Sequence, residues 1–198
     1  MIPVKYIGVW LKRFRKRCGY GVHSPFAFNF ITGVVFEKGQ YYAFKDLDRI
    51  YLPGFFQRFS YKRKCLHFLF RLANYVHPDS FLVDIPQNAP EMSYMKAACR
   101  HALWLQVDET IEVPFEKVLM YMDSFNRNLD CILGNTLGKL HPGSALLLRV
   151  HSNRDREKYI EYFRKSPFCG VTFDLYDYLL VFFDLTLYKQ HYIVNFFD

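Results

Sequence analysis

The sequence is short of glycine and proline and has no long apolar run. Only 10 of its 198 residues are Gly and 9 are Pro, which excludes collagen-like and low-complexity chains. No apolar run approaches the length of a membrane span. The apolar stretch 7–11 is too short for the core of a signal peptide, and no small-residue cleavage site follows it, so we expect a cytoplasmic protein.

Cysteine is also scarce, and its spacing excludes the usual metal and disulfide frameworks. The cysteines are odd in number and include no C-x-x-C pair, and no histidine stands beside them at zinc-finger spacing. The five residues are Cys18, Cys65, Cys99, Cys131 and Cys169. We therefore expect buried, reduced thiols.

Acidic residues are absent from the first 36 positions, although that segment holds six bases. These bases are Lys5, Lys12, Arg13, Arg15, Lys16 and Arg17. The whole chain has 26 Lys and Arg against 19 Asp and Glu, a net charge of +7, so the rest of the chain carries 20 bases against 19 acids. The basicity belongs to the N-terminal segment, and the remainder is close to neutral.

The basic segment has the pattern of an amphipathic helix. On a helical projection the bases lie opposite one apolar arc, which consists of Val4, Ile7, Trp10, Leu11, Phe14 and Cys18. Two interpretations stay open: the arc packs on the domain and the cations are solvated, or the bases bind an acidic partner or a membrane surface. No nucleic-acid-binding signature accompanies the helix, so we do not expect DNA or RNA as a partner.

Aromatic residues are plentiful, with 21 Phe and 15 Tyr, and predict an aromatic core. Apolar residues recur at helix spacing from Leu66 to Ala73, and the run Phe81–Ile85 is typical of a buried parallel strand. A helix begins near Ser24, where Pro25 suits a first turn. We further expect helices at 91–102, 115–125 and 153–165 and strands at 103–107, 129–133, 145–150, 171–175, 179–183 and 192–196, the last two as a hairpin.

This alternation of elements predicts an α/β fold, a Rossmann-like three-layer sandwich with a mostly parallel sheet and a C-terminal antiparallel hairpin. Residues 1–65 form an N-terminal helical extension that starts with the basic helix, and residues 66–198 form the Rossmann-like domain. Ligands of such folds bind at the carboxyl ends of the strands, near the switch point in strand order.

Several segments near the two ends of the chain carry a recognisable pattern. They are the stretch 19–28 with its Val-His-Ser-Pro-Phe motif, the stretch 69–75, and the C-terminal stretches 171–176, 181–183 and 189–192. In this order they resemble a bacterial group of class I S-adenosylmethionine-dependent methyltransferases. The chain resembles a shortened and divergent member, with losses after Tyr42 and around Asp108.

The resemblance implies a glycine-rich loop after the first strand, because only glycine lets the backbone approach the cofactor closely. The corresponding stretch here, 86–91, contains no glycine and two prolines, and no glycine occurs between Gly54 and Gly134. The resemblance therefore predicts a methyltransferase-like protein with a degenerate cofactor loop and weak or no activity. Binding of S-adenosylmethionine stays open.

The resemblance also assigns candidate cofactor-binding residues. Asp84 ends the first strand, Asn88 lies in the loop, and Asp108 or Glu109 stands where an acid would accept hydrogen bonds from ribose hydroxyls. The last two residues also suit the N-terminus of a following helix. Asn135 corresponds to part of an Asp-Gly-Asn-His stretch of the family.

A metal site is not expected. The stretches that match the family's acidic positions, 133–136 and 148–152, contain no carboxylate, and a hard cation requires oxygen ligands. His151 follows a strand and is the candidate catalytic base, with a surface histidine before a helix as the alternative. For His23 a structural role at the helix start competes with acceptor binding.

Three functions follow from these observations. The first is the degenerate methyltransferase-like protein. The second is an active, metal-independent methyltransferase for a small-molecule acceptor, in which proximity alone drives the transfer. The third is a non-catalytic protein that docks on a partner or membrane through its basic N-terminal helix.

Overall fold

The computed structural model describes residues 7–16, 18–54, 60–107 and 116–196. The chain forms two compact units, which we describe separately. The first unit comprises Met1–Tyr75, Gln87–Arg100 and Val194–Asp198, and the second comprises Val76–Pro86 and His101–Ile193. Residue 65, where we expected the helical extension to end, lies inside a helix, and the division into 1–65 and 66–198 stays a prediction.

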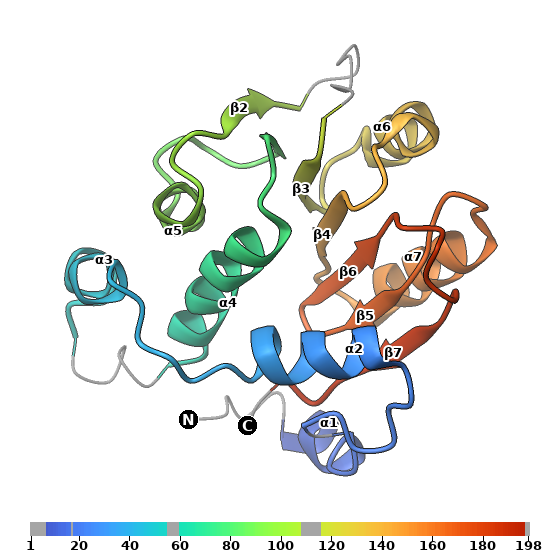
Figure 1. Ribbon diagram of the computed structural model, residues 1–198, viewed down its shortest axis with the longest axis horizontal. Coiled ribbons are helices and arrows are strands. Elements are labelled where there is room, and N and C mark those ends of the chain that lie inside the picture. Colours follow the sequence, from blue (N-terminus) through green and yellow to red (C-terminus); the bar gives the residue numbers. More distant parts are fainter. Residues whose placement is uncertain (1–6, 17, 55–59, 108–115, 197–198) are drawn as a thin grey trace. The chain divides into compact units, whose positions relative to one another are not determined.

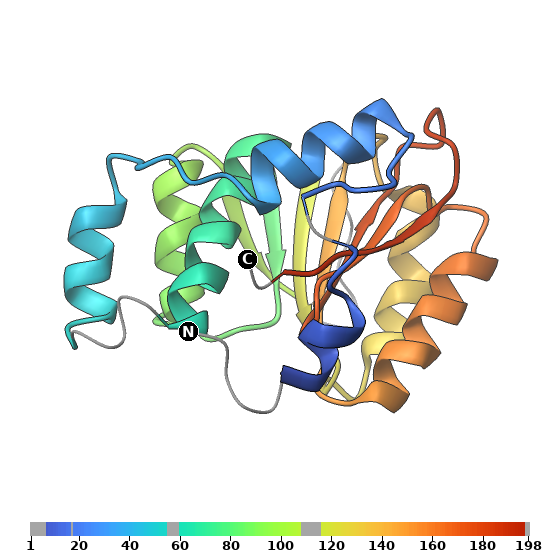
Figure 2. The same cartoon turned by 90° about the horizontal axis from the view of Figure 1, so that it is seen from below.

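The second unit is built on a seven-stranded mixed sheet in the order β2-β1-β3-β4-β6-β5-β7 (Figures 1 and 2). The pairs β1–β2, β1–β3, β3–β4 and β5–β7 are parallel, whereas β6 is antiparallel to both of its neighbours. The strands are β1 Ser80–Val83, β2 Leu103–Gln106, β3 Val118–Asp123, β4 Ala145–Arg149, β5 Thr172–Asp174, β6 Tyr178–Phe182 and β7 His191–Ile193. The predicted α/β fold class is confirmed.

The strand order has a switch point between β1 and β3. From β1 the chain continues to β2 on one side of the sheet, and it then returns to place β3 on the other side of β1. In open α/β sheets the loops at such a point diverge and leave a crevice at the carboxyl ends of the two strands. The residues after Val83 and after Asp123 therefore lie where a ligand is expected.

One face of the sheet packs against two helices of the same unit. These are α6 Leu129–Thr136 and α7 Asn153–Lys165, and a 3-10 turn, η4 Leu137–Lys139, follows α6. Alternate strand residues such as Met120, Leu146 and Leu148 join Ile132 and Phe163 from the helices in one core. Strand residues on the other face, including Phe81 and Leu147, are buried too. Such near-continuous burial explains the long apolar runs in these strands.

Two sequence predictions between residues 115 and 133 were wrong. Of the helix expected at 115–125, the described part forms β3, a continuous apolar run whose periodicity does not distinguish a helix from a buried strand. The strand expected at 129–133 is α6. Its buried residues recur at the helical spacing of three and four and continue past the range we considered: Leu129, Ile132, Leu133 and Thr136.

The C-terminal antiparallel hairpin is formed by different strands from those expected. β5 and β6 pair antiparallel, with Phe173 opposite Leu180, and residues 175–177 join them. β7 does not continue the hairpin, because it pairs with β5 in parallel, with Phe173 opposite Tyr192. The expected hairpin of the last two strands was therefore wrong, although the antiparallel element itself is present.

The first unit consists of helices. After the turn 19–21, in which Gly19 and Gly21 have positive φ, Ser24 caps α2 by accepting a hydrogen bond from Ala27 N at 3.3 Å. This start matches the prediction. The described helices are α1 Ile7–Lys12, α2 Pro25–Phe30, the π-helix η2 Ile31–Val35, α3 Phe44–Tyr51, α4 Tyr61–Val76 and α5 Pro90–Ala98.

A buried carboxylate connects three of these helices. Asp48 on α3 accepts hydrogen bonds from Arg63 Nε and His67 Nε2 of α4, both at 2.8 Å, and from Tyr94 Oη of α5 at 2.7 Å. Phe44 stacks on His67 with ring centroids 3.7 Å apart. Burial raises the pKa of Asp48, but the three hydrogen bonds outweigh burial and leave that pKa below its ordinary value.

Burial has the opposite effect on the pKa of the base in this cluster, His67. It lowers the pKa of His67, and the neighbouring Asp48 only partly compensates. His67 is therefore neutral at neutral pH and donates a hydrogen bond through Nε2. Because both carboxylate oxygens of Asp48 have partners on α4 or α5, the cluster ties α3 to these two helices.

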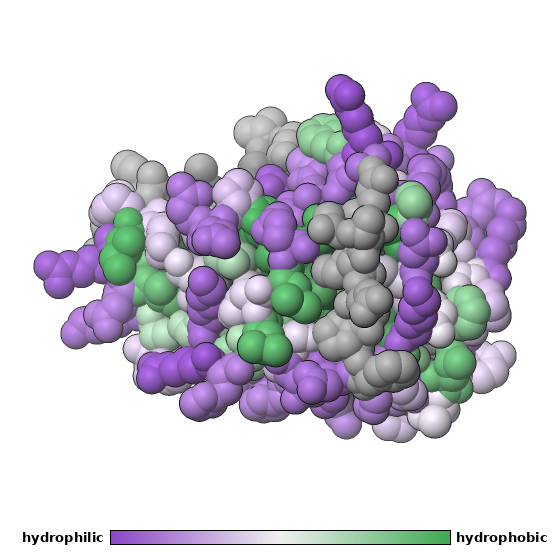
Figure 3. Space-filling view, turned by 90° about the horizontal axis from the view of Figure 1, so that it is seen from above, coloured by the Kyte–Doolittle hydropathy of each residue, from purple (hydrophilic) through white to green (hydrophobic). Residues whose placement is uncertain are grey.

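On the face of the molecule in Figure 3 most side chains are hydrophilic, with hydrophobic side chains between them. No helix within the described residues is long and apolar enough to cross a membrane. The cysteines were only partly predicted: Cys65 and Cys169 are buried, whereas Cys18 and Cys131 are exposed, and all five cysteines are thiols.

Candidate functional site

Polar side chains gather at the carboxyl ends of the strands that flank the switch point. Asp84 follows β1, Asp123 ends β3, and His151 follows β4 two residues after Arg149. The parallel register places these ends at one edge of the sheet, because Asp123 lies opposite Arg149 and the backbone N–H of Asp84 donates to Tyr121 O at 2.9 Å. All belong to the second unit.

Asp84 is half-buried and tied to the loop after β3. Asn126 Nδ2 donates a hydrogen bond to its Oδ2 at 2.9 Å, and Asp123 adds a backbone hydrogen bond. Burial raises the pKa of Asp84, and the negative charge of Asp123 acts in the same direction, against these two hydrogen bonds. The site thus holds two neighbouring carboxylates in different environments.

Asp123 and His151 form an ion-pair geometry at the same edge. Nε2 of His151 lies 2.9 Å from both carboxylate oxygens of Asp123. Since an ionised carboxylate only accepts, the imidazole carries its proton on Nε2, and Nδ1 of the neutral ring is an acceptor. Phe125 stacks on the imidazole with ring centroids 3.9 Å apart and 6° between the planes, which fixes the ring orientation.

A buried hydroxyl completes this group. Ser124 Oγ has no hydrogen-bond partner in the part of the chain that the structure describes. Buried hydroxyls in folded proteins nearly always have partners, so this one is an exception. The carboxylates and the imidazole offer acceptors that suit a small polar ligand with amino or hydroxyl groups.

The turn between β1 and α5 does not fit the cofactor loop that the family resemblance implies. Pro86 and Pro90 lack a backbone N–H, and the N–H of Met92 already donates to Ala89 O at 3.1 Å. No residue from 84 to 91 has a positive φ, so the backbone of this turn adopts no conformation that requires glycine. Two positions of the loop therefore lack the N–H donor that could contact the amino-acid and ribose parts of S-adenosylmethionine.

Comparisons with known proteins found similar chains only among solved structures. No protein-family model matches the chain, and no curated protein matches it significantly. Among solved structures the chain is similar to the SAH-bound methyltransferase of Podospora anserina, at 10% identity and TM-score 0.47, over 93% of this chain and 98% of that chain. It is also similar to a methyltransferase from Geobacter sulfurreducens, at 13% identity and TM-score 0.43, again over 93% and 98%.

At identities of 10% and 13% and TM-scores below 0.5, these two similarities assign no site, cofactor or activity to this chain. The fold itself follows from the strand order and the pairing directions.

The predicted site residues are not all brought together. Asp84 and His151 lie at the same edge of the sheet, as expected for residues after strands. Asn88 is exposed in the turn before α5 and belongs to the first unit, and Asp108 and Glu109 lie outside the described residues. Asn135 was chosen as a residue after a strand, which was wrong: it lies in the last turn of α6 and donates to Cys131 Sγ at 3.6 Å.

Asp123, Ser124 and Asn126 were not among the residues predicted from the sequence. The strand before β4 is β3 rather than 129–133, so the residues that follow that strand are 124–126. This strand ends in a carboxylate, that of Asp123. The signal was present, because 118–123 is an apolar run that ends in an acid, the same pattern that identified β1.

Metal binding gains no support from this correction. Within the described residues no group of three or more His, Cys, Asp or Glu side chains is arranged to hold a metal ion. The carboxylate of Asp123 is instead paired with His151.

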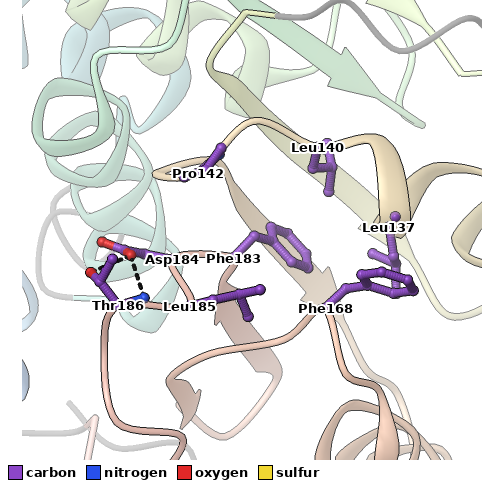
Figure 4. A pocket seen from close by; sticks show the side chains of 9 residues that line it. Leu137, Leu140, Pro142, Phe168, Phe183, Asp184, Leu185 and Thr186 are labelled. Carbon is purple, nitrogen blue, oxygen red and sulfur yellow. Dashed lines mark hydrogen bonds between the residues drawn. The ribbon is translucent and has the colours of Figure 1, made fainter.

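An apolar cavity of about 330 Å³ lies elsewhere in the second unit (Figure 4). Its lining comes from the segment before β4, the loop between α7 and β5, and the segment after β6, and it includes Leu140, Phe168 and Phe183. Phe182 pairs with Ala145, the first residue of β4, so the cavity lies at the amino end of that strand. At its edge Asp184 accepts hydrogen bonds from Thr186 at 2.9 and 2.6 Å. The cavity is therefore separate from the group around His151.

Proposed function

We propose that the chain is a methyltransferase-like protein that binds S-adenosylmethionine weakly or not at all and has little or no transferase activity. The observation that carries this proposal is the proline-bounded turn after β1, which has no glycine and no residue with positive φ. A cofactor loop needs close backbone approach and free N–H donors, and both are reduced here. The Asp84–Asn126 hydrogen bond further occupies the carboxylate that ends β1.

Thermal unfolding with S-adenosylhomocysteine tests the proposal. Ligand at about 1 mM stabilises a protein by about 0.4 kcal/mol if the Kd is about 1 mM, and by about 2.7 kcal/mol if the Kd is about 10 µM. For a chain of this size these values correspond to Tm increases of about 1–2 °C and about 5–11 °C. We expect an increase of no more than about 2 °C.

The Asp84→Asn and Glu157→Gln variants serve as a matched pair. Glu157 is exposed on α7, remote in sequence from the strand ends. A large Tm increase that Asp84→Asn removes and Glu157→Gln retains would show that the strand-end site binds the cofactor tightly, and would overturn the proposal. Calorimetric titration with S-adenosylmethionine gives the same answer as an affinity.

The second candidate is an active, metal-independent methyltransferase for a small-molecule acceptor. The Asp123–His151 pair favours it, because a carboxylate-oriented imidazole accepts a proton from a hydroxyl or amine at Nδ1. S-adenosylmethionine would supply the methyl group. Phe125 would hold the ring in place and shield it on one face.

Release of S-adenosylhomocysteine in the presence of candidate acceptors separates the two functions. If the chain is active, His151→Gln should lower turnover by about a hundredfold or more, whereas the exposed His141→Gln variant should keep it. Turnover that responds equally to both variants, or no turnover with any acceptor, counts against the second candidate.

A further inference from the structure

Three apolar side chains of the basic N-terminal segment are exposed. α1 contains no buried residue. Ile7 is 47% exposed, Leu11 is 61% exposed, and Phe14 is 49% exposed. The spacing of four and three residues places these side chains near one line along the segment. Trp10 of the same arc is half-buried, so the arc is packed only in part within the described residues.

Hydrogen bonds fix the backbone and one side chain of this segment to the rest of the first unit. Arg13 Nη1 donates to Val194 O at 3.3 Å, and the backbone N–H of Asn195 donates to Lys16 O at 2.9 Å. Asn195 Nδ2 adds a longer bond to Trp10 O at 3.5 Å. Phe14 also meets Trp10 edge to face, with ring centroids 5.4 Å apart. The segment is thus tied to its unit, while Ile7, Leu11 and Phe14 keep about half of their surface exposed.

Cations flank the exposed apolar line. Lys12, Arg15 and Lys16 are all exposed, and no acidic residue occurs among the first 36 positions. Exposed aliphatic and aromatic side chains bordered by bases are the two components that an anionic membrane surface recognises. A nucleic acid would use the cations but leave Ile7 and Leu11 in water.

We propose that the segment 7–16 docks on an anionic lipid membrane. Ile7, Leu11 and Phe14 enter the boundary between headgroups and acyl chains, and the three lysine and arginine side chains lie at the level of the lipid phosphates. The attachment is peripheral and salt-sensitive, because part of its strength is electrostatic. It is independent of whether the strand-end site binds a cofactor.

Vesicle cosedimentation of the full chain tests this proposal. At low salt we expect retention on phosphatidylcholine vesicles that contain phosphatidylglycerol, and at least about tenfold less on phosphatidylcholine alone. Ile7→Ser combined with Leu11→Ser should reduce retention at least about tenfold, and Lys12→Glu combined with Lys16→Glu should do the same.

Two control variants carry the same kinds of substitution at positions outside the segment 7–16. Ile50→Ser replaces an isoleucine that is 66% exposed on α3, and Arg154→Glu with Arg164→Glu reverses two exposed charges on α7. Both should bind vesicles like the unmodified chain, with circular dichroism confirming that every variant is folded.

Three outcomes would overturn the proposal. The first is no retention on anionic vesicles, and the second is retention that the segment 7–16 variants and the controls reduce equally. The third is displacement of the protein from the vesicles by duplex DNA or RNA, which would show that the cations bind a nucleic acid.

Discussion

At the scale of single residues, Asp48 receives more side-chain hydrogen bonds than any other acid described above. We predict that Asp48→Asn lowers the free energy of unfolding by about 2–4 kcal/mol, because it leaves the buried His67 and Tyr94 with poorer partners. Urea denaturation measures this change. The neighbouring Asp46→Asn, at an exposed position of the same helix, should change stability by less than about 1 kcal/mol. Equal losses in the two variants would contradict the role of the cluster.

The same cluster predicts how stability depends on pH. The folded-state pKa of His67 is below the ordinary value of 6.5, so the unfolded chain binds more protons just below that pH. Stability should therefore fall as the pH is lowered through 6.5. The lowered pKa of Asp48 adds a loss in the same direction at more acidic pH, below its ordinary value of 3.8.

Urea midpoints between about pH 8 and pH 5 measure this dependence. His67→Gln should flatten the slope in that range, whereas the exposed His141→Gln should retain it. If His67→Gln left the dependence of stability on pH unchanged, groups other than His67 would cause the loss of stability in acid.

Individual site residues were predictable where their strand was recognised. Asp84 and His151 follow runs that were identified as strands, and both lie at the ligand end of the sheet. Asp123 and Asn126 were missed only because the segment 115–125 was interpreted as a helix. The pairing of Asp123 with His151 depends on the register of β3 against β4, which local sequence does not encode.

At the scale of elements, replacement of a glycine by alanine should change stability in opposite directions at two positions of the second unit. An added Cβ at Gly170 would lie 2.5 Å from Asp184 O and 3.0 Å from Phe182 O, both backbone atoms that cannot rotate away. Gly170→Ala should destabilise the protein by about 1–3 kcal/mol or more. Gly134 lies in α6 with no atom within 4 Å of an added Cβ, so Gly134→Ala should stabilise by about 0.5–1 kcal/mol. Thermal unfolding measures the stability of both variants. If both were more stable or both less stable than the unmodified protein, the prediction would be contradicted.

Elements with a clear start signal were predicted well. α7 spans the predicted residues 153–165, and Ser152 caps it by accepting a hydrogen bond from Asp155 N at 3.0 Å. β3 and α6 carry no comparable signal: Asn128, which precedes α6, makes no side-chain capping hydrogen bond. Without a cap, a short apolar run is compatible with either state until its burial pattern is known.

At the scale of the whole molecule, the reactivity of the cysteine thiols measures how much of the chain is closed to solvent. Cys18 and Cys131 are exposed, whereas Cys65 and Cys169 are buried, and burial raises the pKa of the partly buried Cys99 to about 11. We predict that a chromogenic disulfide reagent labels two thiols rapidly in the native protein and the other three only after denaturation in urea. Rapid labelling of four or five would contradict the packing, and added reductant should leave the Tm unchanged.

The large-scale fold class was predictable, but the pairings within it were not. Alternating helices and strands indicate a mostly parallel sheet, as observed. That β7 pairs with β5 rather than with β6 depends on contacts between distant segments. The division into two compact units, with 87–100 and 194–198 joined to the N-terminal segment, likewise follows from such contacts.

The hydrogen bonds that hold the basic segment also constrain when it can become ordered during synthesis. Arg13 and its partner Val194 are 181 positions apart, and Trp10 and Asn195 are 185 apart. A ribosome has therefore made nearly all of these 198 residues before the partners of the basic segment leave the exit tunnel. Until then these hydrogen bonds cannot form, so the segment is synthesised long before it can be tied to the C-terminal residues.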